Sequence, residues 1–114
     1  MTRPQDREII KAEHVAGGAG YILKQPIIKE EQLGAHCKMF SEVTLHPGCE
    51  IGYHEHHGET ETYYLIKGAG IYHDNGEEYP VAAGDVTFCK SGGGHGIKNT
   101  GEQDIVFIAL ILAE

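Results

Sequence analysis

Glycine and proline interrupt this chain about every eight to fifteen residues from Gly17 onward. The segments between them are short and rich in Ile, Val, Tyr, Phe and Thr, the residues enriched in strands. Turn residues at this spacing are typical of all-β sandwiches and barrels. The strands predicted on this basis are residues 21–28, 36–45, 61–67, 70–73, 78–81, 85–89, 95–99 and 105–112. Only residues 1 to about 16, with a weak helical charge pattern, are predicted to be helical or irregular.

The length of 114 residues indicates one domain spanning 1–114. A chain of this size buries roughly two-thirds of the surface that its unfolded form exposes, so it forms a core without a disulfide or a metal. Its 3 cysteines, Cys37, Cys49 and Cys89, are odd in number and show no C-x-x-C spacing. We therefore expect reduced thiols that pack as small hydrophobic side chains.

Charge and hydropathy exclude several classes of partner. The formal net charge is −8, with 9 basic against 17 acidic residues, and phosphate binding depends on Lys and Arg. The longest apolar stretch, residues 105–113, is too short to cross a bilayer, and the first residues contain no apolar signal core. These observations predict a cytoplasmic protein without a nucleic-acid or membrane partner.

Two segments give further detail of the sheet. Asp74-Asn75-Gly76 supplies residues that tolerate positive φ, so it predicts a hairpin between the strands on either side. Residues 105–112 are apolar on both faces, so their outer face also needs a cover. A second subunit or a long N-terminal segment can provide that cover.

Five of the 8 histidines fall between His54 and His95. On an extended strand, His54 and His56 point to the same face, because side chains alternate with a period of two. Glu61 follows at the start of the next predicted strand, so one hairpin presents two imidazoles and a carboxylate to a common point. His95 stands in the glycine-rich segment 92–96, where missing side chains leave room for close approach.

Three neutral imidazoles and one carboxylate suit one divalent transition ion, namely Fe, Mn, Ni, Cu or Zn, rather than Mg or Ca. A six-coordinate ion would keep two positions open for water, substrate or dioxygen. The alternative is a solvated polar loop with a separate, hydrogen-bonded His95; the shared spacing argues against it. His57 faces away from this group by strand alternation, which predicts a surface or outer role.

These residues also match two sequence motifs at fixed spacing. The first is formed by Gly48, His54, His56, Glu61 and Gly68. The second is formed by Gly84, Gly92, His95 and Asn99, with Lys90 where the motif has proline. Over residues 48–99 the chain resembles the cupin family, specifically its small single-domain bacterial members.

The resemblance implies a double-stranded β-helix, or jelly-roll barrel, commonly assembled as a homodimer. It places motif 1 at 48–68, motif 2 at 84–99 and an N-terminal arm at 1–20. It also implies that His54, His56, Glu61 and His95 are the metal ligands. Lys90 at the proline position is expected to loosen a turn and to bring an ammonium group near the barrel mouth.

Tyr63 is a candidate catalytic residue, because it follows Glu61 by two positions and shares its face. Plain packing inside the barrel competes with that role. Tyr53 and His73 are weaker candidates for lining the mouth.

The arginines bear on the substrate. Arg3 and Arg7 are the only two, and both precede the barrel, so no barrel strand offers a guanidinium fork for a carboxylate or phosphate. This disfavours an oxalate-type decarboxylase and a sugar-phosphate isomerase, although the ion itself can bind a carboxylate.

The leading hypothesis is a metalloenzyme acting on a small oxygenated or carboxylated metabolite chelated at the metal, by isomerase, lyase, decarboxylase or dioxygenase chemistry. The competing hypothesis is a cupin that binds or senses a small molecule without turnover.

Overall fold

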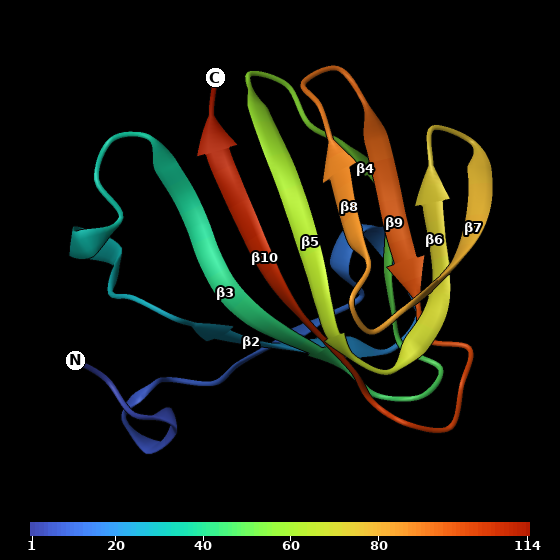
Figure 1. The fold of residues 1–114 in the computed structure, drawn as a ribbon, viewed down its shortest axis with the longest axis horizontal. Helices are drawn as coiled ribbons and strands as arrows, with labels where there is room; N and C mark the ends of the chain where they lie inside the picture. The colour runs from blue at the N-terminus through green and yellow to red at the C-terminus, as the bar shows by residue number, and fades with distance from the viewer.

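Two antiparallel sheets face each other in the computed structural model, which describes residues 1–114. The six-stranded sheet has the order β1-β2-β3-β10-β5-β8 and the four-stranded sheet the order β4-β9-β6-β7. The strands of the larger sheet are β1 (Ile10–Glu13), β2 (Tyr21–Pro26), β3 (Cys37–Leu45), β5 (Glu59–Lys67), β8 (Val86–Cys89) and β10 (Ile105–Ala113). Those of the smaller sheet are β4 (Glu50–Glu55), β6 (Ala69–Asp74), β7 (Glu77–Ala82) and β9 (Gly94–Lys98). The predicted all-β, double-stranded β-helix architecture is confirmed (Figure 1).

Three short 3₁₀ helices, η1 (Pro4–Asp6), η2 (Val15–Gly17) and η3 (Glu30–Gln32), complete the chain. The core lies between the sheets, where the larger sheet contributes Tyr63, Leu65 and Phe107 and the smaller sheet contributes Tyr72 and Ile97. All five are at most 3% exposed. Burial of each such side chain stabilises the fold by about 1.5–3 kcal/mol. This core packs the inner faces of the two sheets together, and the site described below lies next to it.

Every predicted strand corresponds to a strand of the structure, but two strands were not predicted. The expectation that residues 1 to about 16 are helical or irregular is wrong for β1, which pairs with β2 and extends the larger sheet. Its sequence, Ile-Lys-Ala-Glu, has little strand propensity, so its pairing partner decides its conformation. β4 was missed because a bulge between Ile51 and His54 breaks its alternation.

The predicted hairpin at Asp74-Asn75-Gly76 is present between β6 and β7. Asn75 has φ 50° and Gly76 has φ 92°, so both central residues are left-handed. Two positive φ values are what a type I′ turn requires.

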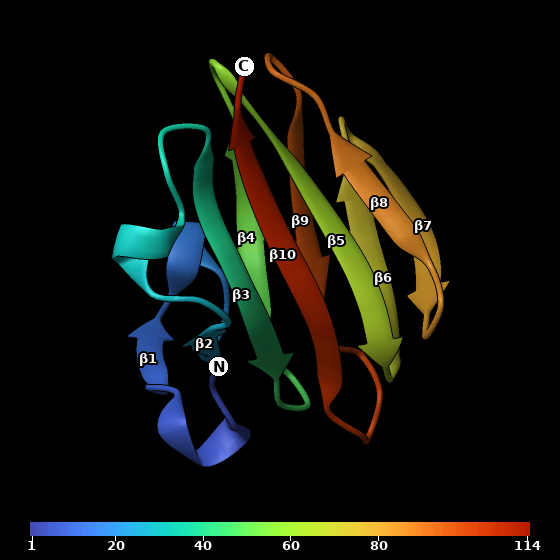
Figure 2. The same cartoon turned by 60° about the vertical axis from the view of Figure 1, so that its left-hand side comes forward.

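β10 runs through the middle of the larger sheet, between β3 and β5 (Figure 2). Its inner residues Ile105, Phe107 and Ala109 are buried, whereas its outer side chains are only half-buried. The N-terminal segment lies beside β3 and leaves the outer faces of β10, β5 and β8 uncovered (Figures 1 and 2). Of the two covers expected from the sequence, the N-terminal segment therefore does not serve, and a second subunit stays a prediction.

The three cysteines are unpaired, as expected. No helix in the structure is long and apolar enough to span a membrane.

Candidate metal centre

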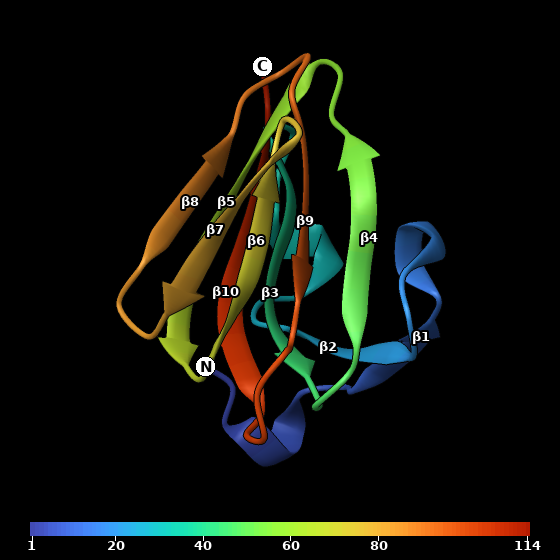
Figure 3. The ribbon, with the colours of Figure 1, turned by 90° about the vertical axis from the view of Figure 1, so that its right-hand side faces the viewer.

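Four side chains from three neighbouring strand segments converge inside the barrel. His54 lies on β4, His56 directly follows that strand, Glu61 is on β5 and His95 is on β9. β4 and β9 run side by side (Figure 3), and His54 is paired with His95 across them. One potential ligand atom from each residue lies within 4.8 Å of all the others. The sequence-based prediction that these four residues share one point is thus confirmed.

The carboxylate of Glu61 is at the centre of the group. Its Oε1 atom lies 2.8 Å from His95 Nε2, 2.9 Å from His56 Nε2 and 3.5 Å from His54 Nε2. The Nε2 atoms of His56 and His95 are 3.2 Å apart. All three imidazoles therefore present the same nitrogen to one carboxylate oxygen.

The hydrogen-bond partners of the Nδ1 atoms show where the ring hydrogens of His54 and His56 lie. His54 Nδ1 donates to the Gly52 carbonyl at 2.9 Å, and His56 Nδ1 donates to Glu59 Oε2 at 2.7 Å. Because a carbonyl and a carboxylate only accept, each Nδ1 bears the hydrogen, and in its neutral form each ring turns an Nε2 lone pair inward.

This donor set fits a divalent transition ion. Lone pairs from imidazoles and a carboxylate oxygen would repel one another without a cation between them. Metal–nitrogen bonds of about 2.0–2.1 Å place two ligand nitrogens about 3.0–3.4 Å apart, and the His56–His95 separation of 3.2 Å lies in that range. The four residues are thus arranged so that they could hold one ion.

Burial and the surrounding imidazoles set the charge at the centre. Burial by itself raises the pKa of Glu61, but the imidazoles of His54, His95 and His56 outweigh it and lower this pKa to about 2. Burial lowers the pKa of His95, which favours its neutral form. The site therefore offers one carboxylate together with a neutral His95. His54, with 24% of its side chain exposed, is the most accessible of the four and marks the opening of the site.

Local backbone features explain how the strands come so close. A Cβ on Gly94 would collide with the Tyr53 hydroxyl, and a Cβ on Gly96 would lie 2.9 Å from the Ile51 carbonyl oxygen. The glycine-rich segment therefore gives steric clearance, as expected. Asn99 ends this region fully buried, and its amide donates to the Leu45 and Gln103 carbonyls at 2.9 and 2.8 Å.

Comparison with known proteins agrees with this architecture. The sequence model of a protein family, described as Cupin domain, matches residues 41–111. The chain belongs to the cupin family. It is 38% identical over 102 residues to the oxalate-binding protein of Thermotoga maritima, covering 90% of this chain and 84% of that protein.

Solved cupin structures extend the comparison. A predicted oxalate decarboxylase from Thermotoga maritima superposes with a TM-score of 0.95 at 35% identity, covering 100% of this chain and 99% of the other. A putative sugar phosphate isomerase from Acidithiobacillus ferrooxidans superposes with a TM-score of 0.68 at 25% identity, covering 81% and 60%. The whole chain thus follows the arrangement of the Thermotoga protein.

Tyr63 packs directly against the centre in this cupin. Its ring stacks on the His95 ring with centroids 4.8 Å apart and packs against Phe107 at 4.4 Å. The residue is 1% exposed, and burial raises the pKa of its phenol well above 10. The Tyr63 ring is therefore packed against the centre, and its phenol keeps its proton beside the four residues; catalysis by Tyr63 stays a prediction.

The other sequence candidates lie farther out. Tyr53 is 51% exposed and covers Gly94, while His73 contacts Glu78 on the outer surface at 3.3 Å. His57 is exposed, as predicted. Lys90 is exposed too, and the turn after it is closed by a hydrogen bond from the Gly93 N–H to the Lys90 carbonyl at 2.9 Å. The expected loosening of that turn by Lys90 stays a prediction.

Two residues that contact the centre were missed from the sequence. Glu59 holds His56 from three positions away, a spacing that a search for outer acceptors would have found. Tyr72 contacts His95 Nδ1 through its hydroxyl at 2.7 Å. It comes from β6, and only the pairing of β6 with β9 brings it there.

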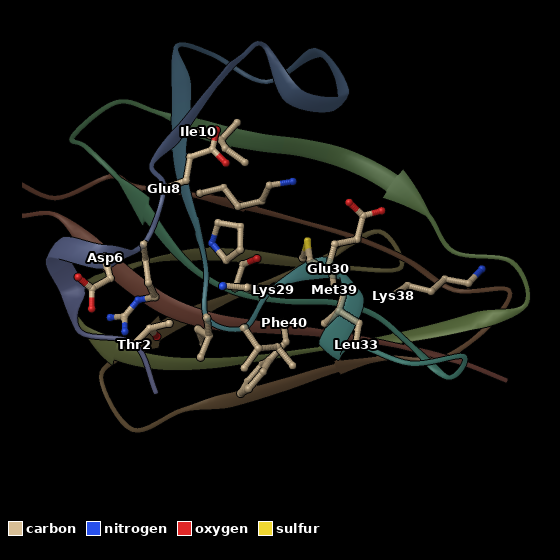
Figure 4. Close-up of a pocket in the computed structure, with 16 residues that line it drawn as sticks. Thr2, Asp6, Glu8, Ile10, Lys29, Glu30, Leu33, Lys38, Met39 and Phe40 are labelled. Carbon is tan, nitrogen blue, oxygen red and sulfur yellow. The ribbon is translucent and has the colours of Figure 1, made fainter.

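A cavity of about 440 Å³ lies away from the four residues, between the N-terminal segment, β2 and β3 (Figure 4). None of the four converging side chains lines it. Arg7 lines this cavity. Although Arg7 precedes the barrel strands in the sequence, its side chain packs against the folded domain. The cavity also carries Asp6, Glu8 and Glu30, so its lining is of mixed charge.

Proposed function

We propose that this cupin binds one divalent transition-metal ion through His54, His56, Glu61 and His95, and that a small carboxylated metabolite of the oxalate class chelates that ion. The convergence of lone pairs on Glu61 Oε1 is the observation that carries the proposal. The ion is one of Fe, Mn, Ni, Cu and Zn. If it is six-coordinate, the four protein ligands leave two coordination positions open.

Charge supports a carboxylated ligand. A divalent ion with one Glu carboxylate and neutral imidazoles has a formal charge of +1, which attracts an anionic oxygen ligand. An arginine in the barrel is then unnecessary, which answers the argument from the sequence against oxalate. A dicarboxylate with adjacent carboxyl groups presents two oxygens for two open positions. The names given to the Thermotoga maritima protein and to the Thermotoga maritima structure both refer to oxalate and support the same class.

The reaction that we propose is decarboxylation. The carbon–carbon bond of the oxalate monoanion breaks, and the carboxylate group leaves as carbon dioxide. The remaining carbon keeps the electron pair and takes up a proton to give formic acid, which then loses its carboxyl proton to give formate. When bound, the ion supplies Lewis-acid stabilisation of the carboxylate oxygens. Tyr63 is the candidate proton donor, because it is protonated and stacks on His95.

Binding without turnover is the second candidate function, and the same tyrosine favours it. Full burial raises the Tyr63 pKa well above 10, and a phenol with so high a pKa gives up its proton reluctantly. The name of the oxalate-binding relative agrees with this alternative.

We further propose that the protein is a homodimer. Tyr64, Ile66, Val86 and Phe88 lie on the outer face of β5 and β8 and are 44–63% exposed. An exposed apolar sheet face of this kind marks an interaction surface. A second copy would also cover the outer side chains of β10.

Metal content is the test of the central proposal. Protein purified without chelator or His tag is analysed by elemental mass spectrometry, beside the His54→Ala variant and a His57→Ala control. We expect about one transition-metal ion per chain in the wild type and in the control, and none in His54→Ala. Equal metal content in wild type and His54→Ala would refute the site.

Oxalate then separates the two functions. The metal-loaded protein is titrated with oxalate in a calorimeter, and the oxalate that remains is measured after prolonged incubation. Binding with consumption indicates the decarboxylase, and binding without consumption indicates the binding protein. Absence of binding by the loaded protein would exclude oxalate as the ligand.

A further inference from the structure

The three imidazoles differ in the groups that hold them from outside. The outer partners of His54 and His56 are pure acceptors, a carbonyl and a carboxylate, which impose one tautomer. The outer partner of His95 is the hydroxyl of Tyr72, which both donates and accepts. The contact alone therefore leaves the tautomer of His95 undecided, although His95 is fully buried and central to the site.

A second observation lies next to Tyr72. Thr87, on β8, is 8% exposed, and its Oγ1 is a buried polar atom without a hydrogen-bond partner. Thr87 and Tyr72 line the same cleft between β7 and β8, where the edges of the two sheets meet. A buried hydroxyl without a partner is costly, so its presence calls for an explanation.

One arrangement of protons accounts for both observations. For Nε2 of His95 to turn a lone pair inward, its Nδ1 must carry the hydrogen and donate it to the Tyr72 oxygen. The phenol proton of Tyr72 is then free to point away from His95, and it needs an acceptor. Thr87 Oγ1 has no hydrogen-bond partner in this structure and lines the same cleft as Tyr72, so it becomes that acceptor when the two hydroxyl groups turn toward each other.

We propose that Tyr72 and Thr87 form an outer hydrogen-bond relay that positions His95 as a metal ligand. In this relay His95 Nδ1–H donates to Tyr72 Oη, and Tyr72 Oη–H donates to Thr87 Oγ1. Tyr72 is the positioning residue, and Thr87 acts only through Tyr72. The inference rests on the proposed metal site. It adds a chain of hydrogen bonds that runs from His95 to the cleft between β7 and β8.

Burial is consistent with this relay. Tyr72 is 3% exposed and Thr87 is 8% exposed, so water has little access to either hydroxyl group. Ordered outer partners of metal-binding histidines typically change metal affinity 10–100-fold when they are removed.

The test is a double-mutant cycle on metal affinity. Tyr72→Phe, Thr87→Val and the double variant are prepared with a Tyr79→Phe control, which removes an exposed phenol that lines the same cleft and is bonded to Glu77. Affinity for Zn²⁺ is measured by competition with a chromophoric chelator, and the visible spectrum of bound Co²⁺ reports ligand geometry. Denaturant unfolding of each metal-free variant shows whether it folds.

We expect Tyr72→Phe to weaken Zn²⁺ binding 10–100-fold and to alter the Co²⁺ spectrum, with Thr87→Val producing a smaller loss and Tyr79→Phe none. Because Thr87 acts through Tyr72, the double variant should bind no more weakly than Tyr72→Phe alone. Fully additive losses would overturn the relay, and so would unchanged affinity and spectrum in a folded Tyr72→Phe protein.

Two further outcomes are also decisive. If Tyr72→Phe does not fold, Thr87→Val becomes the deciding variant, and wild-type affinity with a wild-type spectrum would overturn the relay. If the wild type itself binds neither Zn²⁺ nor Co²⁺, the proposed metal site fails, and the relay fails with it.

Discussion

His56 and His95 face each other through their Nε2 atoms at 3.2 Å, and both nitrogens lie within 2.9 Å of the same Glu61 oxygen. A single proton can bridge one pair of these atoms, but it leaves the remaining lone pairs opposed. A cation with several coordination positions satisfies all of them at once. The metal-free site is thus electrostatically frustrated, and binding of an ion should relieve this frustration.

Metal loading should therefore stabilise the fold. A ligand that binds only the native state at 100 times its dissociation constant adds about 2.7 kcal/mol, which corresponds to roughly 10 °C in Tm for a domain of this size. Differential scanning calorimetry of chelator-treated protein with and without one equivalent of Zn²⁺ measures this shift. The Glu61→Gln variant serves as the control and should show little or no shift. A shift of equal size in that variant would mean that the ion stabilises the protein from another site.

The carboxylate of Glu59 should strengthen metal binding through His56. It accepts the Nδ1 hydrogen at 2.7 Å and fixes the ring, and the hydrogen bond from His56 lowers the pKa of Glu59. We expect Glu59→Gln to weaken Zn²⁺ binding 10–100-fold, measured by chelator competition. Glu55→Gln, an exposed change of the same charge on β4, is the matched control and should keep wild-type affinity. Equal losses in both variants would point to overall charge instead of ring positioning.

Asn99 should be a determinant of stability rather than of metal binding. Its amide donates to the Leu45 and Gln103 carbonyls, and its oxygen accepts from the Gly101 N–H at 3.0 Å. Replacement by alanine leaves the buried Leu45 carbonyl unpaired and removes the two partly buried hydrogen bonds to Gly101 and Gln103, so we expect Asn99→Ala to lower the free energy of unfolding by about 2–4 kcal/mol. Urea unfolding of the metal-free protein measures the loss, and the exposed Thr100→Ala is the control. A change below about 0.5 kcal/mol would contradict this role.

A charge placed on the apolar outer face of β5 and β8 should dissociate the proposed dimer. Phe88 is 60% exposed at the edge of that face, so Phe88→Lys should convert a dimer into a monomer without disturbing the core. Light scattering at micromolar concentration gives the mass of each protein. Ile9→Lys, which charges an equally exposed apolar residue on the N-terminal segment, should remain dimeric. A wild type that is already monomeric would refute the dimer.

Sequence patterns predicted eight of the ten strands and the group His54, His56 and Glu61, because these depend on local spacing. His95 was placed with that group by its glycine-rich segment and by the motif spacing that resembles cupins. Alternation, turn residues and the His54–His56 interval are written within a few positions of the chain. The outer contacts were harder to predict for a physical reason. Tyr72 reaches His95 only after β6 has paired with β9, a relation between segments 23 residues apart. The weak strand β1 was likewise decided by its neighbour rather than by its own residues.

Removing the Tyr63 hydroxyl tests whether this residue donates a proton or only packs, because proton donation needs the hydroxyl and packing needs only the ring. The ring stacks on His95 and Phe107, and Tyr63→Phe preserves that ring, so the variant should fold and bind metal and oxalate like the wild type. If the phenol protonates the carbon left after carbon dioxide departs, the variant should lose at least about 100-fold in turnover with little change in oxalate affinity. Formate release and calorimetric binding, measured on the same metal-loaded sample, separate the two effects. Tyr64→Phe, a change on the opposite face of β5, is the matched control and should retain full activity. Unchanged formate release in Tyr63→Phe would assign Tyr63 to packing and leave the proton to another donor, such as water that enters beside the partly exposed His54.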